Sequence, residues 1–170
     1  MREKKIIGSK IANQTLNPTK FAKIEKKKNL PALYTRNARD YTGMYGPSMQ
    51  ENIFKAVNGS RAVLDGEMLS YDELTKSFVP FGNNRYVALQ LDANQHLCYM
   101  VFDILYYSNG SETYDLRNTP LEARRELLEK VIQPIQKHVE VVPQTKLTSR
   151  DTQQILKELD NAIDRHEEGL

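Results

Sequence analysis

The sequence predicts an α+β domain in which antiparallel strands are flanked by helices. Strand-like runs dominate from about residue 61 to residue 107, and only short turns separate them, which favours antiparallel pairing. Residues 99–105 are apolar at nearly every position, a pattern typical of a central strand that is covered on both faces. Apolar residues at helical spacing occur before and after this strand region, so we expect helices outside the sheet.

The N-terminal third contains two expected helices and a strand. Residues 1–28 are polar and Lys-rich, and Phe21, Ile24 and a first-turn Pro18 predict a short helix over 18–27. Residues 30–35 predict a short strand, followed by a turn-rich segment over 37–46. Ser48 and Glu51 match a capping box, and the apolar spacing behind them predicts a helix over 48–57.

The remaining elements follow from the same two periodicities. Strands are predicted over 61–70, 78–81, 86–91 and 98–107, as an antiparallel meander. A helix is predicted to begin at Thr119-Pro120, a short strand to cover 139–142, and a last helix to begin near Ser149, where Thr148 and Asp151 match a second capping box.

The bulk composition excludes few classes of function. The 170 residues suffice for one domain with a core, and 39% hydrophobic and 27% charged residues are typical of a globular chain. A net charge of +2 does not by itself require a nucleic-acid partner. The single cysteine, Cys98, cannot form an internal disulfide and indicates a reducing compartment. We expect no signal peptide and no membrane span.

Residues 62–68 and 98–103 carry the clearest chemical signal. Each segment is an apolar, strand-like run that ends in carboxylates. In the first, Gly66 allows close backbone approach and Glu67 can face a pocket. The second ends in Phe102-Asp103, an aromatic ring beside an acid. Strands that bring carboxylates and an aromatic ring to one cleft suit a nucleotide and its metal ion.

Several segments in order resemble the adenylation domain of ATP-dependent DNA ligases. Tyr34–Thr42 resembles the family's Ser-Arg-Asn-Gly segment, and Leu64-Asp65-Gly66-Glu67-Met68 resembles motif III. Residues 98–105 resemble motif IIIa, Leu116 to Arg125 resembles a family helix start with paired arginines, and Glu167-Glu168-Gly169-Leu170 resembles the start of motif IV. Within the family, the chain is most similar to the eukaryotic DNA ligase IV group. The resemblance implies a partial nucleotidyltransferase fold.

The resemblance also implies a reaction and a set of site residues. In such enzymes a lysine attacks the α-phosphate of ATP, AMP passes to a DNA 5′-phosphate, and a 3′-hydroxyl closes the nick. By motif match, Glu67 and Glu168 would hold Mg²⁺, Phe102 would stack on the adenine, and Arg36, Glu67 and Phe102 would bind the nucleotide. We expect Asp65 and Asp103 to support the site through hydrogen bonds to backbone.

The resemblance further implies where the parent protein acts. ATP and Mg²⁺ are the implied cofactors, and a nicked or broken DNA duplex is the implied partner. For the ligase IV group, this means DNA repair and recombination by non-homologous end joining, with end-joining protein partners. The expected location is the nucleus of a eukaryote, or otherwise the cell interior.

One motif of the family is missing from the 170 residues. The nucleophile of the family lies in Lys-x-Asp-Gly, and none of Lys20, Lys23 or Lys26–Lys28 is followed by x-Asp-Gly. We therefore interpret 1–170 as a partial adenylation domain: 1–29 is a lead-in segment from which the catalytic motif is deleted, and 30–170 runs from motif Ia to the start of motif IV. No catalytic residue is assigned, because an ordinary exposed lysine is protonated and a poor nucleophile.

Three interpretations remain open at this point. The chain is a fragment of an ATP-dependent DNA ligase whose parent seals DNA breaks. Alternatively, it is a non-catalytic remnant or truncated product that at most binds a nucleotide or a partner. A third alternative is another nucleotidyltransferase, such as an RNA ligase or a capping enzyme. In each case we predict that this chain alone does not ligate DNA.

Overall fold

A computed structural model describes residues 21–25, 31–35, 37–79, 84–89, 93–144 and 152–164, with the backbone alone described over 21–25. The described strands are β1 (Phe21–Glu25), β2 (Ala32–Tyr34), β3 (Arg61–Asp72), β4 (Ser77–Val79), β5 (Gln95–Ser108), β6 (Thr113–Asp115) and β7 (Val139–Val141). The described helices are α2 (Thr42–Ala56), α3 (Asn84–Ala88), α4 (Leu121–Val131) and α5 (Thr152–Asp164). This mixture of strands and helices confirms the predicted α+β class.

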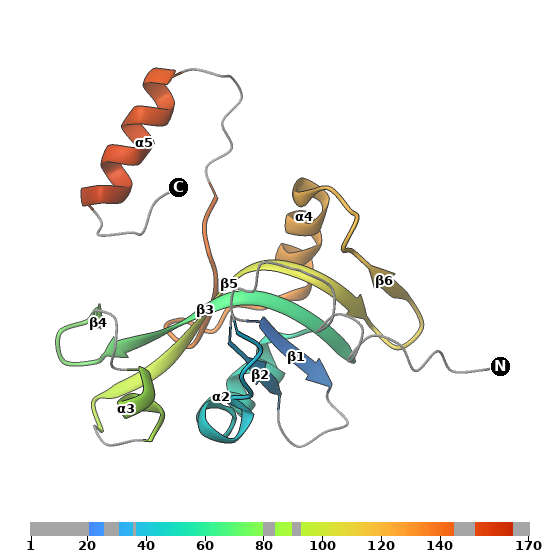
Figure 1. Ribbon diagram of the computed structural model, residues 1–170, viewed down its shortest axis with the longest axis horizontal. Coiled ribbons are helices and arrows are strands. Elements are labelled where there is room, and N and C mark those ends of the chain that lie inside the picture. The colour runs from blue at the N-terminus through green and yellow to red at the C-terminus, as the bar shows by residue number, and fades with distance from the viewer. Residues whose placement is uncertain are drawn as a thin grey trace.

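The described strands form one curved sheet centred on two long strands (Figure 1). The order is β2-β1-β3-β5-β6, and β4 pairs with β3 while β7 pairs with β5. All of these pairs are antiparallel except β5 with β7, which is parallel. The predicted antiparallel pairing is therefore correct for β3 with β4 and for β3 with β5, but the predicted meander order is wrong, because β4 and β5 pair with opposite edges of β3. The central position predicted for β5 is confirmed by its strand neighbours on both edges, whereas Met100, Phe102 and Asp103 on its second face are only half-buried.

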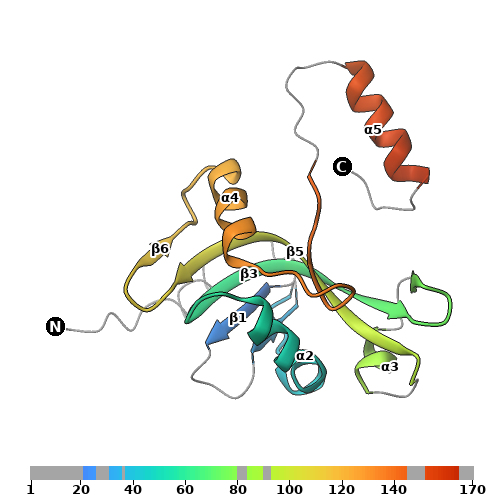
Figure 2. The same ribbon diagram turned by 180° about the vertical axis from the view of Figure 1, so that it is seen from behind.

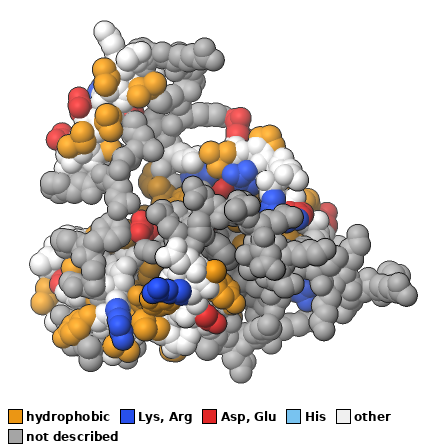
Figure 3. Space-filling view, in the orientation of Figure 1, with side chains coloured by type: hydrophobic (Ala, Val, Ile, Leu, Met, Phe, Trp, Pro, Cys, Tyr) orange, Lys and Arg blue, Asp and Glu red, His pale blue; other side chains and the backbone are white. Residues whose placement is uncertain are grey.

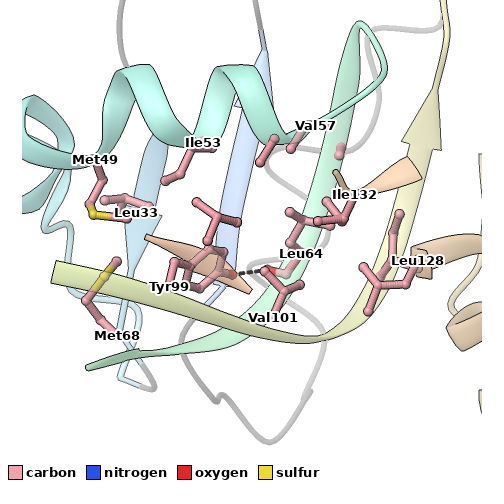
Figure 4. Packing of buried hydrophobic residues seen from close by; sticks show 14 of the residues in the cluster. Leu33, Met49, Ile53, Val57, Leu64, Met68, Tyr99, Val101, Leu128 and Ile132 are labelled. Carbon is pink, nitrogen blue, oxygen red and sulfur yellow. Dashed lines mark hydrogen bonds between the residues drawn. The ribbon is translucent and has the colours of Figure 1, made fainter. Parts of the chain in front are cut away.

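The main core lies on one face of this sheet, beneath α2 and α4 (Figures 2 and 4). Ile53 of α2, Leu64 of β3 and Leu128 of α4 are completely buried in it. The C-terminal ends of the two helices meet, because the backbone N–H of Asn58 donates to the Val131 carbonyl at 2.7 Å and that of Gln133 donates to the Ala56 carbonyl at 2.7 Å. The amphipathic stripes of both helices thus cover the same sheet face.

Two β-bulges bend the centre of the sheet. Along the β3–β5 ladder, Gly66 pairs with Val101 and Asp65 with Asp103, so Phe102 is an extra residue on β5. The pairing of Leu64 with Ile104 and of Val63 with Tyr106 leaves Leu105 as a second extra residue. Each bulge increases the local bend and twist, which matches the curvature of β3 and β5 in Figure 1.

The prediction of a helix over 18–27 is wrong for the residues that are described. Phe21–Glu25 is strand β1, which pairs with β2 on one side and with Arg61–Asp65 of β3 on the other. A five-residue segment gains hydrogen bonds along both edges in this position. Such tertiary pairing overrides a weak helical pattern.

The predicted strand over 86–91 is also wrong, because Asn84–Ala88 forms the short helix α3. The Asn84 side chain anchors the helix to β3: its amide donates to the Met68 carbonyl at 2.6 Å, and its Oδ1 accepts from the Ser70 hydroxyl at 2.7 Å. Val87 and Ala88 are then buried on one side of a single helical turn. The apolar run over 86–91 is too short for its hydrophobic periodicity to distinguish a strand from a helix.

Helix α2 begins six residues before the predicted start at Ser48. Ser48 is therefore an interior residue whose hydroxyl donates to the Tyr45 carbonyl at 3.0 Å, and the predicted capping box is wrong. Asp40 is bonded to the first turn instead, since its Oδ1 accepts from the Thr42 N–H at 2.8 Å. Gly43, Gly46 and Pro47 are typical of turns in sequence, but stacked rings of Tyr41 and Tyr45 and the burial of Met49 stabilise the helix.

The C-terminal half largely follows the sequence pattern. Helix α4 begins directly after Pro120, as predicted, and β7 occupies the predicted strand at 139–142, whereas β6 was not predicted.

Helix α5 confirms the last helix, but its predicted capping residues Thr148 and Asp151 lie outside the described residues. Apolar side chains gather on α5 in Figure 3. Leu156 and Ile163 of this helix are exposed. Within the described part of the chain, no helix has the length and hydropathy needed to span a membrane.

Candidate functional site

The Asp-Gly-Glu segment of β3 places its two carboxylates on the sheet face away from α2. Leu64 and Met68 are buried in the core beneath α2, and Gly66 lies between them on the same side of the strand. Because successive side chains of a strand alternate between faces, Asp65 and Glu67 point to the opposite face. Both are half-buried there.

The ring of Tyr99 explains why position 66 is a glycine. A Cβ atom at position 66 would lie 2.7 Å from Cε2 of the Tyr99 ring and 2.5 Å from the Met100 carbonyl oxygen. The ring crosses the strand at this point, and its hydroxyl donates to the Leu64 carbonyl at 3.3 Å (Figure 4). The absent side chain therefore lets Tyr99 of the motif IIIa segment pack directly against motif III.

Phe102 lies on the same open face as Glu67, on the neighbouring strand. Val101 and Ile104 are fully buried in the core, so the two residues between them, Phe102 and Asp103, are directed to the opposite face by the bulge. In the ladder, Glu67 is paired with Met100, which is two residues before Phe102. Glu67 and Phe102 are therefore diagonal neighbours across the two strands, a separation that an aromatic side chain can span. The fold thus brings together two predicted site residues that are 35 positions apart in sequence.

The other two predicted site residues, Arg36 and Glu168, lie outside the described residues. Of the described residues near position 36, Ala38 donates from its N–H to the Thr35 carbonyl at 2.9 Å, and Thr35 donates from its N–H to the Arg39 carbonyl at 3.0 Å. The assignments of Arg36 and Glu168 therefore stay predictions. The lysines considered as nucleophiles are outside the described residues too, apart from the backbone of Lys23 in β1.

Asp65 and Asp103 make the backbone hydrogen bonds expected of supporting residues. They are paired across β3 and β5, and each bonds the N–H of the residue that follows it: Asp65 Oδ1 accepts from Gly66 at 3.0 Å and Asp103 Oδ1 accepts from Ile104 at 2.8 Å. Asp103 also forms a bidentate ion pair with Arg124, which raises the pKa of that guanidinium mainly through the hydrogen bond. Both aspartates stabilise the bulged region of the strands.

The chemistry of this face is compatible with Mg²⁺ but supplies only part of its ligands. Mg²⁺ in nucleotide sites is held by one or two carboxylates together with substrate phosphates and water. Glu67 offers a half-buried carboxylate of this kind. Among the described residues there is no group of three or more His, Cys, Asp or Glu side chains that would form a complete protein site. Glu67 therefore fits a metal that arrives with phosphate oxygens.

Cys98 behaves as a buried apolar residue rather than as a nucleophile. Its side chain is fully buried, and burial raises the pKa of the thiol to about 12. A thiol of this kind carries almost no thiolate at neutral pH. Cys98 therefore packs as a small buried hydrophobe.

Sequence reasoning did not assign a role to the paired arginines of α4. Arg124 binds the carboxylate of Asp103, and Arg125 donates from one terminal nitrogen to the Phe102 carbonyl at 2.7 Å. The pair was recognised only as part of a family segment, and no local sequence signal connects it to residues more than 20 positions earlier. Only the packing of α4 against β5 reveals these contacts.

Comparison with known proteins identifies the family to which the chain belongs. A family model described as the ATP dependent DNA ligase domain matches residues 20–170. DNA ligase 4 of Dictyostelium discoideum is 30% identical over 184 aligned positions, which cover 95% of this chain and 16% of that protein. DNA ligase 4 of Homo sapiens is 31% identical over 146 positions, covering 81% of this chain and 15% of that protein. The chain thus spans about a sixth of the length of these relatives.

A solved structure supports the same fold. A mycobacterial DNA ligase D complexed with ATP and MES aligns with a TM-score of 0.51 and 21% identity, over 88% of this chain and 46% of the other. At this identity, the likeness concerns the fold alone. These matches favour the DNA ligase interpretation over the RNA ligase and capping enzyme alternatives. The family model covers most of the sequence, and the chain therefore belongs to the family of ATP-dependent DNA ligase domains.

Proposed function

We propose that this chain binds an adenine nucleotide on the sheet face that carries Glu67 and Phe102. The observation that supports the proposal best is the bulge at Phe102, which directs this ring to the same face as Glu67 of the adjoining strand. An adenine ring gains stacking energy from a flat apolar partner, and its ribose and phosphates need polar and charged groups nearby. A half-buried aromatic residue beside a half-buried carboxylate provides both.

In this proposal, Phe102 stacks on the base and Glu67 contacts the ribose or the phosphate-bound metal. Arg36 donates to ribose or phosphate oxygens, and Glu168 adds a second carboxylate for Mg²⁺, both by motif match. Mg²⁺ would neutralise phosphate charge when it is bound with the nucleotide. A solved structure of similar fold is that of a DNA ligase D complexed with ATP, which supports the choice of ATP as the nucleotide.

We further infer that the whole protein acts on broken or nicked DNA. The relatives that match are named DNA ligase 4, and by that resemblance the protein would act in end joining in the nucleus, together with end-joining partners. We infer too that this chain alone is not adenylated, since its 170 residues contain no Lys-x-Asp-Gly. We also infer the domain boundaries from the sequence: residues 1–29 form a lead-in segment from which the catalytic motif is deleted, and residues 30–170 run from motif Ia to the start of motif IV.

Titration calorimetry with ATP, with and without Mg²⁺, tests the nucleotide site. Phe102→Ala is expected to weaken binding about tenfold, or about 1.4 kcal/mol, which lies within the roughly 1–3 kcal/mol that stacking contributes per base. Glu67→Gln is expected to reduce the enhancement of affinity by Mg²⁺. Phe78→Ala and Glu126→Gln remove the same groups at exposed positions on β4 and α4, and both should bind as the wild type does. Equal affinity in all four variants would contradict the site.

Incubation with α-labelled ATP and Mg²⁺, followed by denaturing electrophoresis, tests the second inference. No labelled band is expected from this chain, whereas a ligase domain with an intact Lys-x-Asp-Gly serves as the positive control. A labelled band would show that another lysine acts as the nucleophile, and mass spectrometry of the adduct would identify it.

A further inference from the structure

The outer edge of β5 has a gap between its two neighbouring strands. On that edge, β7 pairs with Tyr99–Val101 and β6 pairs with Tyr106–Ser108. Residues 102–105 therefore have no described strand beside them on this edge, although they contain both bulges of the strand. On this edge the Leu105 carbonyl accepts from the Leu116 N–H at 3.0 Å. A bulged segment that lacks a strand on one edge needs further hydrogen bonds there to keep one conformation.

Arg125 of α4 supplies hydrogen bonds at the edge of β5 where no described strand pairs. Its two terminal nitrogens donate to the Phe102 carbonyl at 2.7 Å and to the Val142 carbonyl at 2.5 Å. Val142 is the residue after β7, and its own N–H donates to the Val101 carbonyl at 2.8 Å. The guanidinium therefore connects β5 to the departing chain at the point where the backbone pairing stops.

The burial of Arg125 shows that this arrangement is specific. Only 4% of the residue is exposed, its Nε has no hydrogen-bond partner among the described residues, and burial lowers the pKa of the guanidinium. A buried cation that donates to neutral carbonyls loses more hydration than a surface arginine does. The planar fork makes both bonds with one rigid group, whereas a lysine ammonium is a point charge on a flexible stem.

Arg124 acts on the next residue of the same segment. Its Nε and one terminal nitrogen donate to the two carboxylate oxygens of Asp103 at 2.8 and 2.7 Å. Both side chains are largely buried, with 17% and 15% exposed. Consecutive arginines of one helix thus hold consecutive residues of the bulge, Arg125 through the backbone of Phe102 and Arg124 through the side chain of Asp103.

We propose that Arg125, supported by Arg124, is a positioning residue that holds the Phe102 bulge in the orientation needed to stack on adenine. The inference rests on the proposed nucleotide site and adds to it the groups that fix its aromatic wall. Neither arginine touches the nucleotide in this arrangement. Their effect is transmitted through the β5 backbone and is confined to recognition of the base.

Arg125→Lys in the full chain tests the proposal, with ATP and inorganic tripolyphosphate as separate calorimetric probes. The variant is expected to bind ATP about tenfold more weakly and tripolyphosphate unchanged, because only the base contacts Phe102. Arg117→Lys is the control, since Arg117 forms a bidentate pair with Asp115 like that of Arg124 with Asp103, but it is more exposed and lies outside the gap. It should bind both probes as the wild type does.

A double-mutant cycle with Phe102→Ala separates positioning from general damage to the fold. If Arg125 acts through Phe102, Arg125→Lys has no further effect on ATP affinity in the Phe102→Ala background. Arg124→Lys in the same cycle should show the same dependence on Phe102, and it decides the outcome if Arg125→Lys does not fold. Additive effects, or equal losses for ATP and tripolyphosphate, would overturn the positioning role. A wild-type chain that does not bind ATP would instead overturn the proposed function, and this inference with it.

Discussion

At the scale of single residues, Gly66 determines how closely the two central strands can approach each other. The ring of Tyr99 and the Met100 carbonyl occupy the space that a side chain at position 66 would need. The same glycine separates Asp65 and Glu67 and leaves both on the open face. One residue therefore controls the core packing and the placement of the candidate nucleotide-binding carboxylate.

We expect Gly66→Ala to reduce the free energy of unfolding by about 1–3 kcal/mol, because the new Cβ overlaps a backbone oxygen that cannot move independently. Gly43→Ala is the matched control, because Gly43 is in helix α2 and open space surrounds the position that a Cβ atom would take there. That variant should be neutral or stabilised by up to about 1 kcal/mol. Urea denaturation of both variants measures the difference, and equal stability would contradict the packing described.

At the scale of elements, Asp72 organises the turn that connects β3 to β4. Its Oδ1 accepts from the backbone N–H groups of Leu74 at 2.8 Å and Thr75 at 3.0 Å, and its Oδ2 accepts from the Gln95 amide at 2.9 Å. The hydrogen bond from Thr75 is the main reason that the pKa of Asp72 is lowered, followed by those from Gln95 and Leu74. Each of these bonds favours the ionised carboxylate.

The sign of the resulting pH dependence follows from the lowered pKa. Ionised Asp72 stabilises the hairpin at pH values above its unfolded pKa, near 3.8, and this stabilisation is lost as the pH falls through the lower folded pKa. An NMR titration of the Asp72 carboxyl should therefore show a midpoint below 3.8. Gln95→Ala removes one donor and should move the midpoint upward. A wild-type midpoint at or above the unfolded value would refute this account of the turn.

At the scale of the whole molecule, the main core lies on one face of the sheet. Helices α2 and α4 cover that face, whereas α5 leaves four large apolar side chains exposed: Ile155, Leu156, Leu159 and Ile163. In Figure 1, α5 lies apart from the sheet and its two covering helices. The stability of the described fold should therefore depend on α2 and α4 and very little on the apolar stripe of α5.

An Ile→Ala substitution in α2 and another in α5 test whether stability depends on α2 rather than on α5. Ile53 of α2 is fully buried, and Ile53→Ala is expected to cost about 2–5 kcal/mol through lost burial and a residual cavity. Ile163 of α5 is 59% exposed, and Ile163→Ala should change the free energy of unfolding by less than about 0.5 kcal/mol. Thermal and urea unfolding monitored by circular dichroism compare the two variants. A comparable loss in both would mean that α5 is part of the core.

The sequence by itself determined the fold class, the long strands β3 and β5, helix α4 and the family resemblance. Alternating or continuous apolar runs have a local physical cause, so they can be identified without knowledge of distant contacts. The same local pattern identified Glu67 and Phe102 as a carboxylate and a ring at the ends of apolar runs. These inferences needed only the order of residues along the chain.

The tertiary structure decided the features that depend on pairing between distant segments. Phe21–Glu25 became a strand because β2 and β3 satisfy both of its edges. Helix α2 began early because the rings of Tyr41 and Tyr45 stack and Met49 is buried in the core. The bulge at Phe102 is a property of the register between two strands, and its arginine contacts come from a helix more than 20 positions later. Hydrogen-bond register and helix docking are set by the whole fold, and for this reason local sequence patterns cannot specify them.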